Sequence, residues 1–327
     1  MHPAQFGISA LDTGAGFNQR VDSHGLLCPW PSRVHSNTTT AAAHTLSWLD
    51  EHGMLENDRL ATESYSWLAG RMFPSADANI FQLLSDFTSW IFDHDDVVDE
   101  SDLRADPSAM RRLFDHEFRL FQGQVAPQKP NEEALCDLGR RFQQAAASSV
   151  WFTRFALSFR AYLNGCLWEG ENRATRHAPS VDEYVSLRPF AGAVWLYLDL
   201  MELVLSRPPI QVTENRKIRE LRRCSADLAA WHNDIYSVGK ELRAKDPHNL
   251  VLVIQREQDV ELSAAVSQAV ERSNDRVRTF TKLASSFKSR DALRYIEALR
   301  DFVGGAFDYL LESSRYRSFS EEQALSG

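Results

Sequence analysis

Cysteine is scarce in this sequence, and its few positions form none of the patterns seen in disulfide-rich or zinc-binding proteins. The four cysteines lie far apart, at Cys28, Cys136, Cys166 and Cys224. No two of them form a Cys-x-x-Cys pair, so the sequence predicts neither a zinc site nor a disulfide framework. Reduced thiols in a cytoplasmic protein are the simplest interpretation.

Long apolar runs and an excess of positive charge are also lacking. No stretch approaches the roughly 20 consecutive apolar residues of a membrane span, and the first residues do not resemble a secretory signal. We therefore expect no membrane span. Lys and Arg number 36 against 45 Asp and Glu, which gives a net charge of −9. Because nucleic-acid-binding proteins usually carry a basic surface, no nucleic-acid partner is expected.

Runs of alternating Val and Ile, which are typical of strands, are missing as well. Instead, apolar residues recur at helical spacing from Thr38 almost to the end of the chain. This periodicity predicts an all-α protein, a single helical bundle without an internal domain boundary. The expected helices cover about 39–54, 58–72, 77–97, 106–122, 132–172, 181–205, 213–243, 257–286 and 289–314, with short helical pieces after residue 248.

The two ends of the chain differ in composition from the part between them. The first residues are rich in Gly, Pro, Ser and His and show no sustained periodicity. We therefore expect an irregular N-terminal arm over residues 1–27, one helical domain over 28–317 and a frayed tail over 318–327.

An acidic cluster is the first feature that points to chemistry. The apolar helix predicted over 77–97 runs into five carboxylates within eight residues: Asp93, Asp95, Asp96, Asp99 and Glu100. Carboxylates at a helix C-terminus oppose the helix dipole and repel one another, so a positive group should offset them. Asp95 and Asp99 are spaced i, i+4 and share a face, which suits a hard cation such as Mg²⁺. A solvated helix end and a His/Asp metal site that uses His94 are the alternatives.

A second polar cluster lies on the helix predicted over 213–243. Asn233, Ser237 and Glu241 are spaced i, i+4, i+8 and form one stripe along that helix. An amide oxygen, a hydroxyl and a carboxylate are plausible ligands for a hard cation. Lys240 adds a positive charge that could reach a phosphate. An ordinary amphipathic helix with outward polar residues is the alternative, and the two clusters together favour the metal site.

The two clusters resemble the signature pair of class I terpene synthases in their microbial form. Residues 95–99 (DDVVD) match the family's aspartate-rich DDxxD motif, and residues 233–241 (NDIYSVGKE) match its NSE motif. Arg188 lies 45 residues before Asn233, near the place where the family carries its diphosphate-sensing arginine. The pair Arg315 and Tyr316 matches the family's RY pair near the C-terminus.

Gly192 falls where the family places its effector carbonyl, at a break in a helix. The local sequence agrees, because Pro189 removes a backbone donor and glycine tolerates unwinding. The linker position between sensor and effector is Ala191, whereas relatives often carry a polar residue there. The resemblance covers about residues 28–317 and leaves the first 27 residues unexplained.

The resemblance implies a single-domain helical fold around a central cavity, with three Mg²⁺ ions and an isoprenyl diphosphate substrate. It assigns the metal to Asp95, Asp96 and Asp99 on one helix and to Asn233, Ser237 and Glu241 on the other. Hydrogen bonds to the diphosphate would come from Arg188, Lys240, Arg315 and Tyr316. From their positions one or two turns from these motifs, we also expect a set of cavity-lining residues: Phe87, Ile91, Phe92, Phe190 and Tyr309.

The implied activity is ionisation of the diphosphate followed by cyclisation of the carbocation, with farnesyl diphosphate as the leading substrate. A diterpene cyclase acting on geranylgeranyl diphosphate is the alternative. A chain-elongating prenyltransferase and a non-catalytic helical relative are weaker rivals, because the second motif is Asn/Ser/Glu and every metal ligand is intact. Dimers are common among relatives, although the sequence specifies no homodimer interface.

Overall fold

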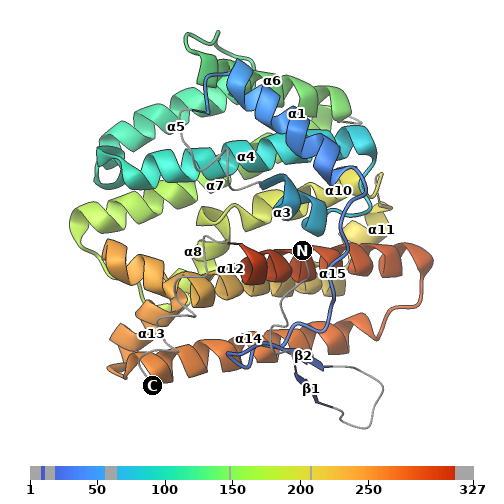
Figure 1. The fold of residues 1–327 in the computed structure, drawn as a ribbon, viewed down its shortest axis with the longest axis vertical. Helices are drawn as coiled ribbons and strands as arrows, with labels where there is room; N and C mark the ends of the chain where they lie inside the picture. Colours follow the sequence, from blue (N-terminus) through green and yellow to red (C-terminus); the bar gives the residue numbers. More distant parts are fainter. Residues whose placement is uncertain (1–8, 12–18, 56–64, 147–148, 207, 314–327) are drawn as a thin grey trace.

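A computed structural model describes residues 9–11, 19–55, 65–146, 149–206 and 208–313 of the chain. Two short strands and a series of helices follow one another in this part (Figure 1). In order they are β1 (Ser9–Leu11), β2 (Gln19–Val21), α1 (Thr38–Glu51), α3 (Tyr65–Met72), α4 (Ala78–Glu100), the 3₁₀ helix η1 (Asp102–Ala105), α5 (Pro107–Phe121), α6 (Pro130–Ala145), α7 (Ser149–Thr175), α8 (Val181–Ala191), α9 (Val194–Asp199), α10 (Met201–Val204), α11 (Ile210–Thr213), α12 (Arg216–Ala244), α13 (Leu250–Gln258), α14 (Leu262–Ala284) and α15 (Arg290–Glu312).

The all-α prediction is confirmed, and side-chain caps explain where several helices begin. The Asp77 carboxylate accepts a hydrogen bond from the Asn79 backbone N–H at the start of α4. Ser180 and Asn215 cap α8 and α12 in the same way. Such caps satisfy backbone donors that have no partner inside the helix.

Two helices that the sequence pattern presented as continuous are divided. The predicted helix over 132–172 is split into α6 and α7, because α6 ends at Ala145 and Ala146 is extended. The predicted helix over 181–205 is split into α8, α9 and α10, and Ala193 has a left-handed φ of 57° between the first two. Apolar periodicity continues across both breaks and could not locate them. The resemblance, however, placed a helix break at Gly192, and α8 does end at the preceding residue, Ala191.

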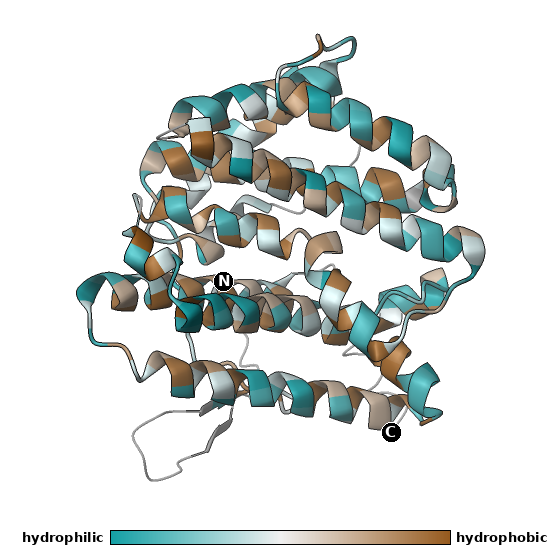
Figure 2. Ribbon diagram, turned by 180° about the vertical axis from the view of Figure 1, so that it is seen from behind, coloured by the Kyte–Doolittle hydropathy of each residue, from teal (hydrophilic) through white to brown (hydrophobic). Residues whose placement is uncertain are grey.

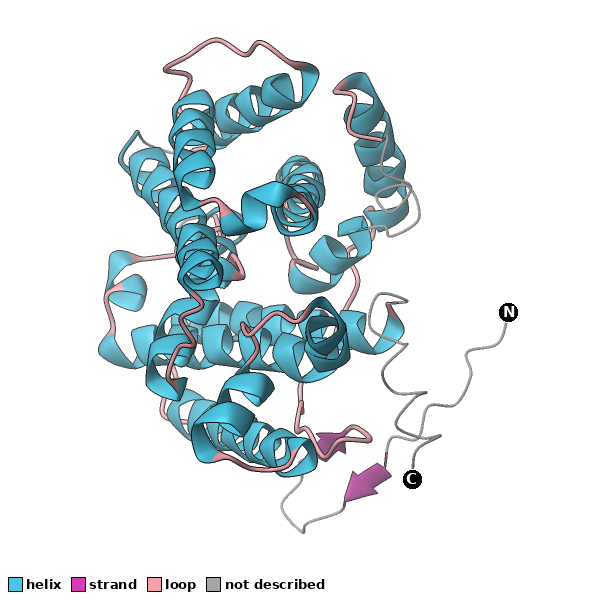
Figure 3. Cartoon of the chain, turned by 90° about the vertical axis from the view of Figure 1, so that its left-hand side faces the viewer, coloured by secondary structure: helices cyan, strands magenta, loops and turns pink. Residues whose placement is uncertain are grey.

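The helices surround a core built from nearly every element (Figure 3). On one side α12 packs against α14 and α15, and α3 lies between α15 and α4. On the other side α7 packs against α5 and α8. Figure 2 shows hydrophilic and hydrophobic residues side by side along the helices. In the ranges given above, no helix is both long enough and apolar enough to cross a membrane.

The described end of the N-terminal segment, residues 19–27, lies against the helices. β1 and β2 form an antiparallel pair in which Ser9 is opposite Val21. From β2 onward the chain lies on α12, α14 and α15. The Arg20 guanidinium pairs with Asp308, and the Tyr236 hydroxyl donates a hydrogen bond to Asp22. Leu26 is fully buried. Residues 20–27 are therefore packed against the helical bundle.

Candidate active site

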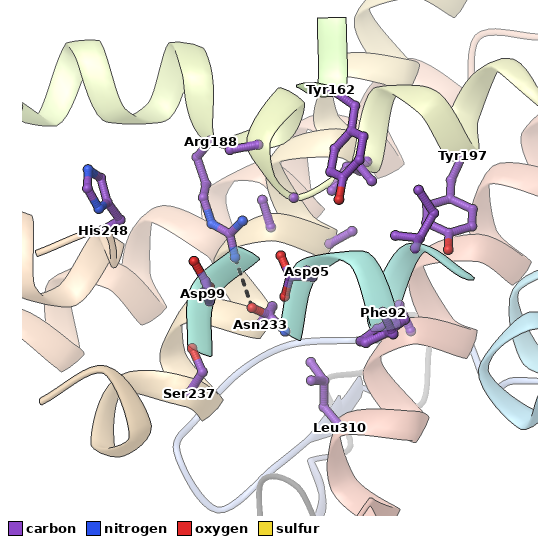
Figure 4. A pocket seen from close by; sticks show the side chains of 18 of the residues that line it. Phe92, Asp95, Asp99, Tyr162, Arg188, Tyr197, Asn233, Ser237, His248 and Leu310 are labelled. Atoms are coloured by element: carbon purple, nitrogen blue, oxygen red, sulfur yellow. Dashed lines mark hydrogen bonds between the residues drawn. The ribbon is translucent and has the colours of Figure 1, made fainter. Parts of the chain in front are cut away.

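A cavity opens between α3, α4, α7, the α8–α9 junction, α12, the loop after α12, and α15. Figure 4 shows Asp99, Arg188 and Ser237 toward one end of it and Phe92, Tyr197 and Leu310 toward the other, so we call these its polar end and its apolar end. The lining residues are Leu68, Met72, Ile91, Phe92, Asp95, Asp99, Tyr162, Glu169, Arg173, Arg188, Ala191, Gly192, Ala193, Val194, Tyr197, Ala229, Ala230, Asn233, Ser237, Lys240, Glu241, Asp246, His248, Phe302, Ala306, Tyr309 and Leu310.

The acidic cluster supplies one wall of this cavity from the C-terminal half of α4. Because the helix continues to Glu100, Asp95 and Asp99 lie one turn apart on the same face, and both line the cavity. Figure 4 shows them directed toward Arg188 and Asn233. Asp96 is 4% exposed and is not among the lining residues.

The opposite wall comes from α12, which is unbroken from Arg216 to Ala244. Asn233, Ser237 and Glu241 therefore keep the common face that their spacing predicts, and all three line the cavity together with Lys240. The two motifs, far apart in the sequence, thus face each other across one space (Figure 4).

Arg188 is held between the two neighbouring residues Asn233 and Asp234. Its Nη2 donates to Asn233 Oδ1 at 2.9 Å (Figure 4). Its Nε donates to Asp234 Oδ1 at 2.9 Å. Asp234 is buried and also accepts hydrogen bonds from the Tyr184 hydroxyl at 2.9 Å and the Leu250 backbone N–H at 3.1 Å. Asp234, whose role the sequence left open, therefore fixes the side chain of Arg188.

The break between α8 and α9 brings backbone to the cavity surface. α8 ends at Ala191, and Gly192 and Ala193 line the cavity before α9 begins. A Cβ atom on Gly192 would lie 2.5 Å from Nη1 of Arg188, so glycine leaves room for the guanidinium. Phe190 points elsewhere, since it is not among the lining residues and its ring lies 6.1 Å from that of Trp195.

The structure places three of the five residues predicted to line the cavity at its surface. Ile91, Phe92 and Tyr309 border the cavity. Phe87 does not: its side chain is fully buried and packs edge-on against Phe142 at a ring distance of 5.0 Å. Phe87 lies one turn before Ile91 on α4. At that depth the side chain packs in the core and no longer borders the cavity. Arg315 and Tyr316 lie outside the described residues.

Two of the carboxyl groups that line the cavity have raised pKa values. Burial, together with the charge of Asp95, raises the pKa of Asp99 to about 7. Burial also raises the pKa of Glu241 to about 7, and the negative charge of Asp246 adds to the effect. A cation bound between the walls would lower the cost of ionising both groups.

The donor chemistry suits a hard divalent cation. Carboxylate, amide and hydroxyl oxygens are ligands that Mg²⁺ accepts. In the described part of the chain, no three His, Cys, Asp or Glu side chains are gathered closely enough to hold a metal by themselves. Metal bound at Asp95 and Asp99, or at Asn233, Ser237 and Glu241, would therefore need oxygen atoms from substrate or water to complete its coordination.

His94 does not face the cavity, which argues against the alternative His/Asp metal site. Its Nδ1 is 2.8 Å from the Tyr162 hydroxyl, and its Nε2 is 3.1 Å from a carboxylate oxygen of Glu117. Both ring nitrogens are thus occupied inside the bundle. His94 supports the position of Tyr162, whose side chain borders the cavity.

Four titratable residues of the cavity were not predicted from the sequence: Glu169, Arg173, Asp246 and His248. Glu169 and Arg173 are spaced i, i+4 on α7, and Asp246 and His248 lie in the loop after α12. The i, i+4 pair in a largely apolar helix was the available signal. It could not show which face of α7 turned inward, because that depends on the neighbouring helices.

Comparison with known proteins adds a family match. Residues 86–279 match the model of terpene synthase family 2, C-terminal metal binding. The 10-epi-cubebol synthase of Sorangium cellulosum is 30% identical over 89% of this chain and 97% of its own length. The (+)-T-muurolol synthase of Roseiflexus castenholzii, named as (2E,6E)-farnesyl diphosphate cyclizing, is 29% identical over 92% of this chain and 95% of its own length. The germacradien-4-ol synthase from Streptomyces citricolor has the same fold, with a TM-score of 0.76 at 22% identity over 87% of this chain and 97% of that one.

Proposed function

The chain belongs to terpene synthase family 2, and from that membership we propose that it is a class I terpene cyclase that converts farnesyl diphosphate into a cyclic sesquiterpene and releases diphosphate. The enzyme is a lyase that acts on a diphosphate ester. Family membership also implies dependence on a divalent metal. Mg²⁺ as that metal, and three ions as its number, are part of the proposal.

The observation that carries the proposal is the meeting of two oxygen-rich helix faces at the polar end of one cavity. We assign metal binding to Asp95 and Asp99 on α4 and to Asn233, Ser237 and Glu241 on α12. Asp96 is turned away from the cavity and would act through the packing of α4. Bound metal neutralises the diphosphate and makes it a better leaving group.

Positively charged side chains at the polar end of the cavity would bind the diphosphate. Arg188 and Lys240 face the metal-binding carboxylates and would donate hydrogen bonds to diphosphate oxygens as negative charge develops on them. To reach the diphosphate, Arg188 must first break its 2.9 Å hydrogen bond to the amide oxygen of Asn233. Arg315 and Tyr316 would join them from the segment that follows α15.

The apolar end of the cavity would hold the isoprenyl chain and exclude water from the carbocation. Phe92 and Tyr309 present aromatic rings there, and aromatic faces stabilise cations without acting as nucleophiles. The backbone carbonyl of Gly192, at the α8–α9 break that lines the cavity, is the proposed effector.

The direct test is incubation of the purified protein with Mg²⁺ and farnesyl diphosphate, followed by gas chromatography with mass spectrometry. A cyclic sesquiterpene is the expected product, and EDTA should abolish it. Geranyl and geranylgeranyl diphosphates are assayed in parallel. A better turnover of geranylgeranyl diphosphate would replace the sesquiterpene assignment with the diterpene one. A longer linear diphosphate would indicate chain elongation, and no product from any of the three would contradict the enzyme assignment.

Substitution of single ligands tests the metal assignment. Asn233→Ala and Glu241→Ala should each lower product formation at least ~100-fold, because each removes an oxygen ligand from the proposed metal site. Glu220→Ala is the control: Glu220 also lies on α12, but its side chain is 45% exposed and pairs with Arg276 outside the cavity. Full activity in both ligand variants would remove the assignment.

A further inference from the structure

Arg173 is a buried cation at the polar end of the cavity, and it contacts three carboxylates. Its Nη2 lies 3.1 Å from Asp99 and 3.4 Å from Glu169, and its Nε donates to Asp246 Oδ2 at 2.7 Å. Its side chain is 8% exposed. A divalent metal bound at Asp99 would therefore approach a positive charge that is already in place.

Arg173 cannot easily move out of the way, because its Nε is tied to an anchored carboxylate. Asp246 also accepts a hydrogen bond from Arg104 at 2.9 Å and contacts the His248 ring at 2.7 Å. Burial alone would raise the pKa of Asp246, but the His248 hydrogen bond and the charge of Arg173 lower it below its usual value. Asp246 is thus ionised at neutral pH, and it holds Arg173 in contact with Asp99.

The charges around Arg173 are balanced only in part. Arg173 contacts the carboxylates of Asp99, Glu169 and Asp246, and Arg104 contacts Asp246 as well, so three carboxylates share two guanidinium groups. Burial raises the pKa of Glu169 to about 7, and the charges of Arg173 and Arg188 oppose that rise. Arg173 therefore stabilises the charge of Asp99 in the absence of metal while it is shared with two other carboxylates.

We propose that Arg173 is an internal counter-ion that competes with the divalent metal for Asp99, so that the site binds metal weakly until diphosphate arrives. The physical reason is charge repulsion between the guanidinium and a metal at the same carboxylate, which is little screened inside the cavity. Diphosphate adds negative charge that attracts both cations. Metal and substrate binding then become coupled, each strengthening the other. This inference rests on the metal role proposed above for Asp99.

Metal binding without turnover tests the inference. The full-length protein is titrated with Mn²⁺, and free Mn²⁺ is followed by electron paramagnetic resonance with and without inorganic diphosphate. Arg173→Gln and Arg173→Met remove the competing charge and should bind Mn²⁺ without diphosphate at least ~5-fold more tightly than the wild type. The gain in affinity on adding diphosphate should shrink by the same factor. Arg173→Lys keeps the charge and should stay within ~2-fold of the wild type.

Arg141→Gln is the matched control. Arg141 also pairs with a buried aspartate of α4, Asp86, at 2.7 Å, but lies outside the cavity. Its loss should lower stability and leave the Mn²⁺ affinity unchanged, whereas tighter binding in this control would overturn the inference. Unchanged or weaker Mn²⁺ binding in both neutral Arg173 variants would also overturn it, with the metal site intact. Absence of Mn²⁺ binding in the wild type, even with diphosphate, would instead overturn the proposed metal site.

Discussion

Arg188 joins two neighbouring residues of α12 through one planar group. Its Nη2 and Nε reach the side chains of Asn233 and Asp234, each at 2.9 Å. A guanidinium can make these bonds together because its donors are fixed in a fork. The same fork suits the oxygens of a diphosphate.

Arg188→Lys should therefore lower kcat/KM at least ~10-fold although the charge is kept, because an ammonium group lacks the planar fork that can hold Asp234 and donate to diphosphate oxygens at the same time. The measurement is steady-state release of diphosphate. Arg140→Lys is the control, since Arg140 pairs with Asp137 on the exposed side of α6. Wild-type kinetics in Arg188→Lys would show that only its charge matters.

His232 illustrates a buried residue with no part in the proposed chemistry. It is 1% exposed, neither ring nitrogen has a hydrogen-bond partner among the described residues, and its ring packs against Phe307 at 5.0 Å. Burial lowers its pKa to about 3. The unfolded chain takes up a proton at this residue below pH ~6.5, whereas the folded protein resists it down to about pH 3. The free energy of unfolding must therefore fall as the pH falls through this window.

Replacement of His232 by Phe should remove that part of the pH dependence. Between pH ~6.5 and ~5.5 the wild type should lose about 1 kcal/mol more of its unfolding free energy than His232→Phe. Urea unfolding followed by circular dichroism at both pH values gives the difference. Equal pH dependence in the two proteins would mean that His232 is protonated alike in the folded and unfolded states.

At the level of elements, the crossing of α7 and α8 sets the position of the helix break. Gly165 on α7 lies against the end of α8, where an added Cβ atom would come within 2.5 Å of the Ala191 nitrogen and 2.7 Å of its Cα. Both are backbone atoms and cannot turn aside as a side chain can. The close approach fixes the distance between α7 and the backbone of Gly192.

Gly165→Ala should cost at least ~2 kcal/mol of unfolding free energy, because it overpacks a backbone contact. Gly170→Ala on the same helix should cost less than ~1 kcal/mol, since its added methyl meets the flexible end of Met110 and alanine favours the helix. Denaturant unfolding measures both values. Gly165→Ala should also change the product distribution, because it displaces the α8–α9 break, and a similar cost for both variants would contradict this account.

On the scale of the whole molecule, the N-terminal segment connects helices that are distant in the sequence. Asp22 accepts a hydrogen bond from the hydroxyl of Tyr236 on α12, and Arg20 forms an ion pair with Asp308 on α15. Asn274 on α14 accepts from the Leu27 backbone N–H at 2.8 Å. The segment therefore holds together the two helices, α12 and α15, that border the cavity.

A chain that begins at Cys28 should lose at least ~2 kcal/mol of unfolding free energy, because it lacks the buried side chain of Leu26 and these hydrogen bonds. Thermal and urea unfolding against the full chain give the loss. Ser23→Ala, at an exposed position of the same segment, serves as the control. Unchanged stability of the shortened chain would support the boundary at residue 28 that the composition predicts.

The sequence by itself determined the fold class and the local geometry of each motif. Helical periodicity depends on residues three and four positions apart, so Asp95 with Asp99, and Asn233 with Ser237 and Glu241, share faces once their helices form. The motif pattern likewise indicated the terpene synthase family that the comparisons confirm. All of these properties are local, or are carried by short segments.

The tertiary structure decided which helix faces meet and that the helix predicted over 132–172 is divided after Ala145. Whether a side chain of α4 points into the cavity or the core depends on its neighbours, which is why Asp95 lines the cavity while Asp96 and Phe87 do not. Arg173 and Asp246 enter the site from α7 and from the loop after α12, through contacts between residues 73 positions apart. Such long-range packing leaves no periodic trace in the sequence, because it depends on the shape of the partner surface rather than on the spacing of residues along one helix.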